Sequence, residues 1–220
     1  MNTKHIKEAY LRLVEYVLIN GEIIEDERGS TTLECTNLIM NISNPNGGIL
    51  YNPLSKKNIP VGCVWNEERI SEYSLQLLSP QNKGFKYTYG ERLRFNHGTD
   101  QISEVIQRLK ECRESRRATA VTWKPDIDFT EEDVPCLILL DFKIRDGKLN
   151  TTAVWRSHDI YGAYFPNTHG ISSVMRYVAE KINVKTGSLT THSISAHIYE
   201  HDWDTAKKLI NDNKKGFGWI

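Results

Sequence analysis

One cysteine and one arginine are the residues of this chain whose types and spacing could do chemistry. Cys136 directly follows a proline and precedes a mostly aliphatic run, Leu137 to Ile144, which predicts a buried strand. Asp146-Gly147 then predicts a hairpin turn, and Leu149 to Trp155 predicts the returning strand. Such a hairpin brings Arg156 back towards Cys136, because the turn lies about midway between them. A thiol beside a guanidinium has a lowered pKa and is a usable nucleophile.

Helices and strands on both sides of this hairpin must position the two residues. Periodicity predicts helices over residues 4–20, 67–79, 101–112, 170–182 and 202–213, and further strands over residues 33–42, 118–123 and 188–199. Gly21 is expected to end the first helix, and Asp100 to cap the third. Residues 44–60 are rich in Asn, Gly and Pro, so we expect a loop there and the one flexible segment.

The composition is that of an ordinary soluble globular protein. With 220 residues, the chain is long enough for one domain with a sizeable core, and we expect a single domain over residues 1–220. Lys plus Arg equals Asp plus Glu, which disfavours a strongly basic nucleic-acid-binding protein. No apolar run approaches the roughly 20 residues that cross a bilayer. Four widely spaced cysteines without a CxxC pair favour a reducing compartment, so we expect a cytoplasmic protein.

The histidines do not predict a metal site. His192 and His197 are an odd number of residues apart on a predicted strand, so their side chains should point to opposite faces. No cysteine lies near them in the sequence, and we therefore expect no metal. His158 and His169 are expected to make local hydrogen bonds.

The order of residues around the hairpin resembles the thymidylate synthase family, and is most similar to its shorter, archaeal-type branch. The matching segments are Pro135-Cys136, Arg156-Ser157-His158-Asp159, Asn167 eleven residues after the arginine, Tyr89-Gly90, Ser115-Arg116-Arg117 and His197-Ile198-Tyr199. The resemblance implies an α+β (α/β) fold, a large mixed, mostly antiparallel twisted sheet packed with helices, as in thymidylate synthase and dCMP hydroxymethylase.

The resemblance implies a reductive methylation of dUMP to dTMP, with Cys136 as the nucleophile that adds to the uracil ring. Asn167 would select uracil, because a neutral amide can accept from N3–H and donate to O4. Asp159 would bind the pterin of the one-carbon donor, and Tyr89 would lie at the active-site wall. The donor, a co-substrate, would be 5,10-methylenetetrahydrofolate or a related tetrahydropterin such as methylene-tetrahydromethanopterin.

The resemblance also implies a cage of arginines around the substrate phosphate. Arg116 and Arg117 would reach the phosphate held by the partner subunit, which implies a homodimer with composite sites. His197 and Tyr199 would hold the sugar 3′-hydroxyl. The full set of residues assigned to substrate binding is Arg28, Arg116, Arg117, Arg156, Ser157, His197 and Tyr199.

A glutamate on the helix over residues 67–79 is also expected to serve the site. Glu72 is the nearest candidate, with Glu67 and Glu68 as alternatives. The family's C-terminus closes over the bound folate, which leaves open whether the tail of this chain does so.

The chain departs from the family pattern at several positions. Leu137 stands where the family has a histidine, Trp155 where it has a glutamine, and Ser195 where it often has an aspartate. Three other readings of the same residues therefore stay open. They are a pyrimidine nucleotide 5-hydroxymethylase of the same fold, a cysteine hydrolase that uses Cys136 and His197 with an acid, and a non-catalytic nucleotide-binding protein.

Overall fold

A mixed sheet flanked by helices forms the centre of the computed structural model, which describes residues 1–47, 55–96 and 98–214. The strands are β1 (Asn2–Thr3), β2 (Glu22–Glu25), β3 (Thr31–Ile42), β4 (Thr119–Val121), β5 (Leu137–Arg145), β6 (Lys148–Asp159) and β7 (Lys185–Tyr199). The helices are α1 (Ile6–Asn20), α2 (Glu67–Leu78), α3 (Tyr89–Arg94), α4 (Gln101–Glu111), α5 (Pro125–Asp128), α6 (Tyr164–Lys181) and α7 (Trp203–Asn213), with short 3-10 helices η1 (Lys56–Asn58) and η2 (Glu200–Asp202).

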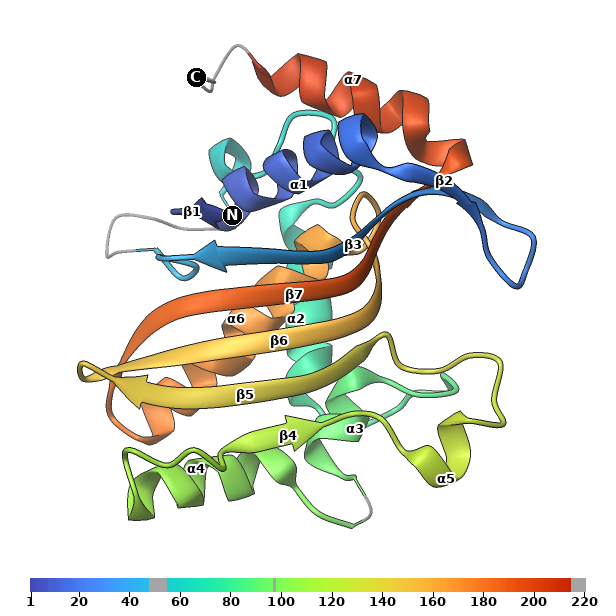
Figure 1. Cartoon of the computed structure of the whole chain (residues 1–220). Helices are drawn as coiled ribbons and strands as arrows, with labels where there is room; N and C mark the ends of the chain where they lie inside the picture. The colour runs from blue at the N-terminus through green and yellow to red at the C-terminus, as the bar shows by residue number, and fades with distance from the viewer. Residues whose placement is uncertain (48–54, 97, 215–220) are drawn as a thin grey trace.

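The sheet is mostly antiparallel, as predicted. Its strand order is β1-β3-β7-β6-β5-β4, with β2 paired to β3 off this path (Figure 1). Only the β1–β3 and β6–β7 pairs are parallel among the described strands. The parallel β6–β7 pair is connected by the long helix α6, as parallel neighbours require a crossover. The fold class inferred from the sequence is therefore confirmed.

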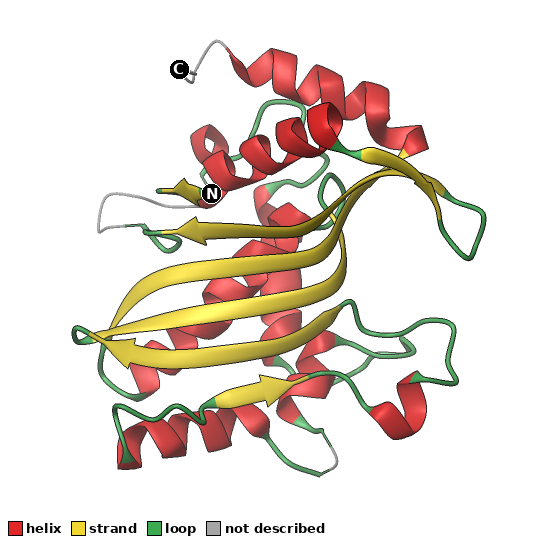
Figure 2. Ribbon diagram, viewed as in Figure 1, coloured by secondary structure: helices red, strands yellow, loops and turns green. Residues whose placement is uncertain are grey.

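Helices cover one face of this sheet. In Figure 2, α2 and α6 lie behind the strands, while the face towards the viewer has no helix over it in the described part of the chain. Two apolar clusters fill the covered side, one around Phe142 and Trp155 and the other around Tyr10 and Phe165. None of the helices described is long and apolar enough to cross a membrane.

The β5–β6 hairpin forms as predicted. Asp146 and Gly147 both have positive φ, 50° and 69°, which is the backbone of the turn that two-residue hairpins favour. In the resulting register Leu137 faces Trp155, and the Arg156 N–H donates to the Cys136 carbonyl at 2.9 Å. The hairpin therefore returns Arg156 to the level of Cys136, and this prediction is confirmed.

Two boundary predictions were wrong. The helix expected from Gly170 begins at Tyr164, so Asn167 lies in its first turn rather than before it. Pro166 permits this early start, because a proline in the first turn loses no intrahelical hydrogen bond. The segment expected to be loop and flexible, residues 44–60, contains the short 3-10 helix η1, and its residues 48–54 lie outside the described residues.

Capping at the other helices follows the sequence closely. Gly21 ends α1, where its N–H donates to the Val17 carbonyl at 2.9 Å. A Cβ at Gly21 would lie 2.6 Å from that oxygen and 2.9 Å from the Leu33 Cβ, so the close approach of α1 to β3 requires glycine. The Asp100 side chain accepts from the Ser103 N–H at 3.1 Å and caps α4 as predicted.

Candidate active site

One pocket of about 300 Å³ gathers most of the predicted substrate-binding residues. It lies at the end of the sheet where β5 begins, β6 and β7 end, and the β2–β3 turn folds over (Figure 1). We call it the cysteine pocket. Its lining residues are Ile24, Asp26, Glu27, Arg28, Thr32, Glu34, Cys136, Arg156, Ser157, Ser195, His197 and Tyr199.

Arg156 is fixed beside the thiol by the backbone that precedes Cys136. Its Nε donates to the Pro135 carbonyl at 3.1 Å, and its Nη2 donates to the Val134 carbonyl at 3.2 Å. The same Nη2 lies 4.0 Å from the Cys136 Sγ. The guanidinium also lies over the Trp123 ring, 5.8 Å from its centroid, which is within cation–π range. The structure thus brings together the thiol and the positive charge that the hairpin predicted.

The pKa of the Cys136 thiol corrects one expectation. Burial raises this pKa above its ordinary value and outweighs the nearby Arg156 and Arg28 guanidinium groups, which lower it. Asp133 and Asp159 also raise it, by disfavouring a second negative charge. The prediction of a lowered pKa was therefore wrong for the single chain, because the amount of desolvation depends on tertiary packing.

His197 lies between two acidic residues on neighbouring strands. Glu34 is its partner across the β3–β7 pair, and Asp159 is its partner across the β6–β7 pair. Burial lowers the pKa of His197, while the two carboxylates oppose that shift. The Tyr199 ring packs edge-on against the imidazole with centroids 5.0 Å apart. The pair predicted to hold a sugar hydroxyl thus lines the cysteine pocket.

Glu34 supplies a carboxylate at the position where the chain lacks an expected aspartate. The Ser195 hydroxyl donates to the Glu34 carboxylate across the β3–β7 pair. The serine therefore does not leave this part of the pocket without negative charge. Sequence reasoning missed Glu34, since nothing local marks a residue on a distant strand as a partner of Ser195.

The β2–β3 turn presents Arg28 to the pocket. The Asp26 carboxylate accepts from the Arg28 N–H at 2.9 Å and from the Ser30 N–H at 2.8 Å, which fixes the turn. The Arg28 guanidinium then donates to the Glu132 carbonyl, on the loop that leads to Cys136. The described lining residues include two guanidinium groups, from Arg28 and Arg156, and three carboxylates, from Asp26, Glu27 and Glu34.

Five predicted site residues lie outside the cysteine pocket, and two of these are exposed arginines. Arg116 and Arg117 lie on the solvent-exposed segment before β4, at the edge of the sheet. Tyr89 is largely buried in α3, and its hydroxyl accepts from the Leu137 N–H at 3.2 Å. Tyr89 therefore supports the start of the strand that carries Cys136.

Asp159 ends β6 and does not line the cysteine pocket. Its carboxylate accepts from the Gly162 N–H at 2.9 Å, and burial raises its pKa. The Gly162 carbonyl accepts from the Trp65 indole at 2.7 Å. The turn from Asp159 to Gly162 therefore connects the end of β6 to the segment that leads into α2.

Asn167 is 6% exposed and is already bound by two side chains. The Tyr73 hydroxyl donates to its Oδ1 at 2.5 Å, and its Nδ2 lies 3.3 Å from the His158 Nε2. The His158 Nδ1 in turn lies 2.9 Å from the Ser193 Oγ. His158 thus makes the hydrogen bonds expected of it, and one of them is to a predicted site residue.

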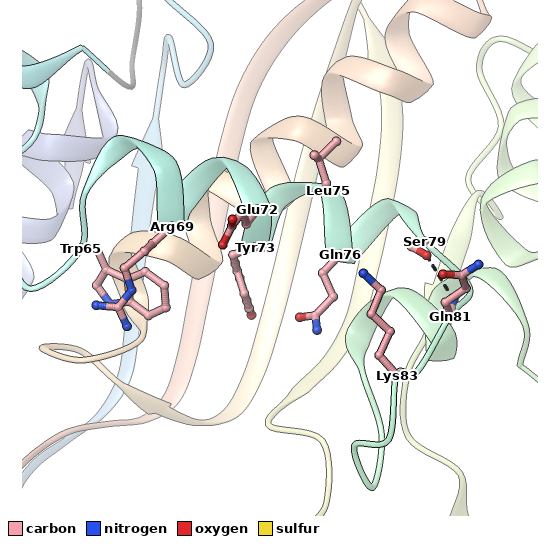
Figure 3. Close-up of a pocket in the computed structure, with 9 residues that line it drawn as sticks. All are labelled: Trp65, Arg69, Glu72, Tyr73, Leu75, Gln76, Ser79, Gln81 and Lys83. Atoms are coloured by element: carbon pink, nitrogen blue, oxygen red, sulfur yellow. Dashed lines mark hydrogen bonds between the residues drawn. The ribbon is translucent and has the colours of Figure 1, made fainter.

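A second, larger pocket of about 620 Å³ lies along α2. We call it the α2 pocket, and its lining residues are Trp65, Arg69, Glu72, Tyr73, Leu75, Gln76, Ser79, Gln81 and Lys83 (Figure 3). Tyr73 connects it to the rest of the site, because its hydroxyl binds Asn167 and it lies close enough to Cys136 for a thiolate there to raise its pKa. Glu72 lines this pocket, whereas Glu67 and Glu68 line a separate one of about 430 Å³.

The residues that sequence reasoning missed are polar or aromatic side chains far from the hairpin. Tyr73 contacts Asn167, and Ser193 contacts His158, but no motif names either of them. The alternation along β7 could have placed Ser193 on the same face as Leu189, since every second residue from Gly187 to Ser193 is buried. No three His, Cys, Asp or Glu side chains converge on a potential metal position within the described ranges.

Comparison with known proteins agrees with this geometry. The family model described as thymidylate synthase matches residues 51–218. A protein of Methanothermobacter marburgensis named "putative thymidylate synthase" is 49% identical over 218 residues, which cover 96% of this chain and 98% of that protein. Proteins with the same name from Methanosarcina mazei and Methanocaldococcus jannaschii are 47% and 35% identical, and their matches cover 96% and 93% of this chain and 94% and 93% of theirs. The chain belongs to the thymidylate synthase family.

Proposed function

We propose that this chain is a cytoplasmic, single-domain thymidylate synthase that methylates dUMP to dTMP. The observation that carries the proposal is the cysteine pocket, in which the Cys136 thiol lies 4.0 Å from the Arg156 guanidinium with His197 and Tyr199 on the same wall. A pocket of this volume has room for a mononucleotide. The four cysteines are free thiols, which suits the reducing cytoplasm.

Cys136 is the nucleophile of the proposed reaction. Its thiolate forms a bond to C6 of the uracil ring, and the C5–C6 electron pair moves onto C5 and O4 as an enolate. C5 then bonds to the one-carbon unit and loses its proton, and release of the thiolate from C6 restores the ring double bond. Burial raises the pKa of this thiol. Either further cationic groups that bind the substrate phosphate lower this pKa, or the thiolate forms only as it adds to the ring.

We expect a second copy of the chain to supply residues that complete the phosphate-binding site. Alone, the pocket offers two guanidinium groups against three carboxylates, which is a poor receptor for a dianion. Arg116 and Arg117 are exposed and away from their own pocket, and one face of the sheet has no helix over it in the described residues. A homodimer with arginines shared across its interface accounts for all three observations.

The α2 pocket fits the one-carbon donor. Its Trp65 and Tyr73 rings have centroids 6.0 Å apart and form an aromatic wall suited to a flat pterin ring. Arg69 lies 4.8 Å above the Trp65 ring, and Lys83 adds a second positive charge for an anionic tail (Figure 3). When bound, a methylene-tetrahydrofolate or methylene-tetrahydromethanopterin supplies the carbon and the hydride. Tyr73 lies between the α2 pocket and Asn167, because it lines that pocket and its hydroxyl donates to the Asn167 Oδ1.

Product mass tests the proposal. The purified protein is incubated with dUMP and methylenetetrahydrofolate, then separately with the methanopterin donor, and the nucleotide is analysed by mass spectrometry. We expect dTMP with at least one donor and none with Cys136→Ala, which should still bind dUMP. A hydroxymethyl product would assign the protein to the hydroxymethylases, and dUMP binding without turnover would make it a nucleotide-binding protein. Thiol-dependent ester or amide cleavage would favour the cysteine hydrolase.

Asn167 should decide between uracil and cytosine. Asn167→Asp replaces an amide donor with a carboxyl group that, when protonated, presents the opposite pattern to the base. We expect the ratio of kcat/KM for dUMP to that for dCMP to fall by about tenfold or more, since a good base contact is worth roughly 1–3 kcal/mol. An unchanged ratio would remove Asn167 from base recognition.

A further inference from the structure

Four side chains, of which Tyr73 is partly buried and the other three are buried, form a continuous line of hydrogen bonds through the predicted base-reading residue. The line runs from Tyr73 on α2 to Asn167 on α6, then to His158 on β6 and Ser193 on β7. His158 and Ser193 are each 1% exposed, and the imidazole stacks on the Trp155 ring with centroids 4.3 Å apart. Packing therefore allows these groups little freedom to choose other partners.

The donors and acceptors of this line are mutually dependent. Burial lowers the pKa of His158 to about 3, so its imidazole is neutral at ordinary pH and has one N–H donor and one acceptor nitrogen. The Asn167 Nδ2 can only donate, so the His158 Nε2 facing it must accept. The His158 proton is then on Nδ1 and points at the Ser193 oxygen. Reversing any one bond reverses all of them.

The line uses half of the amide's capacity. An amide oxygen accepts two hydrogen bonds and an amide nitrogen donates two. Tyr73 takes one acceptor position and His158 takes one N–H, so one of each is left for a ligand. One free acceptor and one free donor, side by side, match the N3–H and O4 of uracil. The reversed line would turn the amide over and match cytosine instead.

We propose that Tyr73, His158 and Ser193 are positioning residues that fix the orientation of the Asn167 amide and thereby set the preference for uracil over cytosine. This inference rests on the proposed function, since it concerns the nucleotide that the site reads. A phenol is a stronger hydrogen-bond donor than an aliphatic hydroxyl, so Tyr73 donates at one end and Ser193 accepts at the other. The direction of the line follows from the chemistry of its two ends.

The first test needs no ligand. Nitrogen-15 NMR of the wild-type protein distinguishes the two neutral tautomers of an imidazole, and we expect the His158 proton on Nδ1. In Ser193→Ala this preference should weaken, because the Nδ1 proton loses its acceptor. A wild-type His158 with its proton on Nε2 would overturn the inference.

The second test compares nucleotide affinities. Calorimetry gives dissociation constants for dUMP and dCMP with the wild type, Tyr73→Phe, Ser193→Ala and the conservative Ser193→Thr. We expect the preference for dUMP to fall about tenfold in the first two variants, the effect of roughly one hydrogen bond, and to return in Ser193→Thr. Thr191→Val is the matched control. Thr191 lies on the same strand as Ser193, and its buried hydroxyl is hydrogen-bonded to the Tyr164 hydroxyl, outside the line.

The outcomes separate this inference from the proposed function. A wild type that binds neither nucleotide would overturn the proposed substrate and the specificity claim with it. A wild type that prefers dUMP, with the preference unchanged in both Tyr73→Phe and Ser193→Ala, would overturn only the positioning role. An equal loss in Thr191→Val would show that any weakening of this region changes the preference, which would also overturn it.

Discussion

The two halves of the site differ in how far their polar groups are paired within one chain. The inner half, defined as Tyr73, Asn167, His158 and Ser193, is buried except for the partly buried Tyr73, and it forms one hydrogen-bonded line. The outer half, the cysteine pocket around Cys136, is partly exposed and contains two guanidinium groups and three carboxylates among its described residues. Buried polar groups need hydrogen-bond partners in the folded chain, whereas groups at a solvated rim are hydrated until a ligand or a partner subunit binds. We therefore propose that base recognition is built into the fold, whereas phosphate recognition needs more positive charge than one copy supplies.

The largest expected effect comes from the scaffold under the outer half. Arg92 and Asp128 form a buried ion pair at 2.7 Å, and Asp128 also accepts from the Lys124 N–H at 2.7 Å. This holds the segment that carries Trp123 beneath Arg156. We expect Asp128→Ala to lower the free energy of unfolding by about 3–5 kcal/mol, because it leaves Arg92 buried without its counter-charge.

Chemical denaturation measures this change. The exposed Glu104→Ala is the control and should change the free energy of unfolding by less than about 0.5 kcal/mol. Equal stability of Asp128→Ala and the wild type would show that the outer half does not depend on this ion pair.

Arg156 tests the outer half directly. We expect Arg156→Ala to lower kcat/KM for dUMP about 10²-fold, since a lost charge-assisted contact to an anion costs up to about 3 kcal/mol. The pKa of Cys136 should rise further, because the guanidinium opposes the effect of burial. Steady-state kinetics measures the first effect, and the pH dependence of Cys136 alkylation measures the second.

Arg156→Lys is the matched control for this prediction. It keeps a positive charge but loses the planar fork that donates to the Pro135 and Val134 carbonyls, so both effects should be intermediate. An alkylation profile of Arg156→Ala that is unshifted, or shifted to lower pH, would contradict the electrostatic role.

A second buried histidine, His169, lies near the inner half and is expected to make stability depend on pH. His169 is 4% exposed, and its Nε2 has no hydrogen-bond partner among the described residues, unlike His158. Burial lowers the pKa of both imidazoles from 6.5 to about 3. Between these values the unfolded chain binds more protons than the folded one. The contribution of these histidines to the free energy of unfolding is therefore fully present above pH 6.5. It falls as the pH drops towards 3, by up to about 1.4 kcal/mol per pH unit for each histidine.

His169→Phe should remove one of these two contributions. We expect the fall in unfolding free energy between pH 6.5 and 4.5 to shrink by up to about 1.4 kcal/mol per pH unit, with the preference for dUMP unchanged. Denaturation curves at several pH values check the first statement and nucleotide calorimetry the second. An unchanged slope would show that His169 is not titrating in this window.

Local patterns predicted the parts of the site that depend on local geometry. The Asp146-Gly147 turn fixes the register of the hairpin, and the register alone brings Arg156 to Cys136. Burial did not follow from the sequence, so the direction of the Cys136 pKa shift was predicted wrongly. Nor did the contact between Tyr73 and Asn167, which joins residues 94 positions apart on two helices. Long-range pairs of this kind depend on how α2 packs on α6, and no local signal in the sequence encodes it.

The sharing of arginines between two copies is the claim that one mixing experiment tests most directly. Cys136→Ala and the double variant Arg116→Ala/Arg117→Ala should each be inactive with dUMP and the donor. After subunit exchange in an equal mixture, we expect about one quarter of wild-type activity to return, because half of the dimers are mixed and each has one intact site. A mixture that stays inactive although mixed dimers form, or a double variant that is fully active alone, would show that the arginines are not shared between copies.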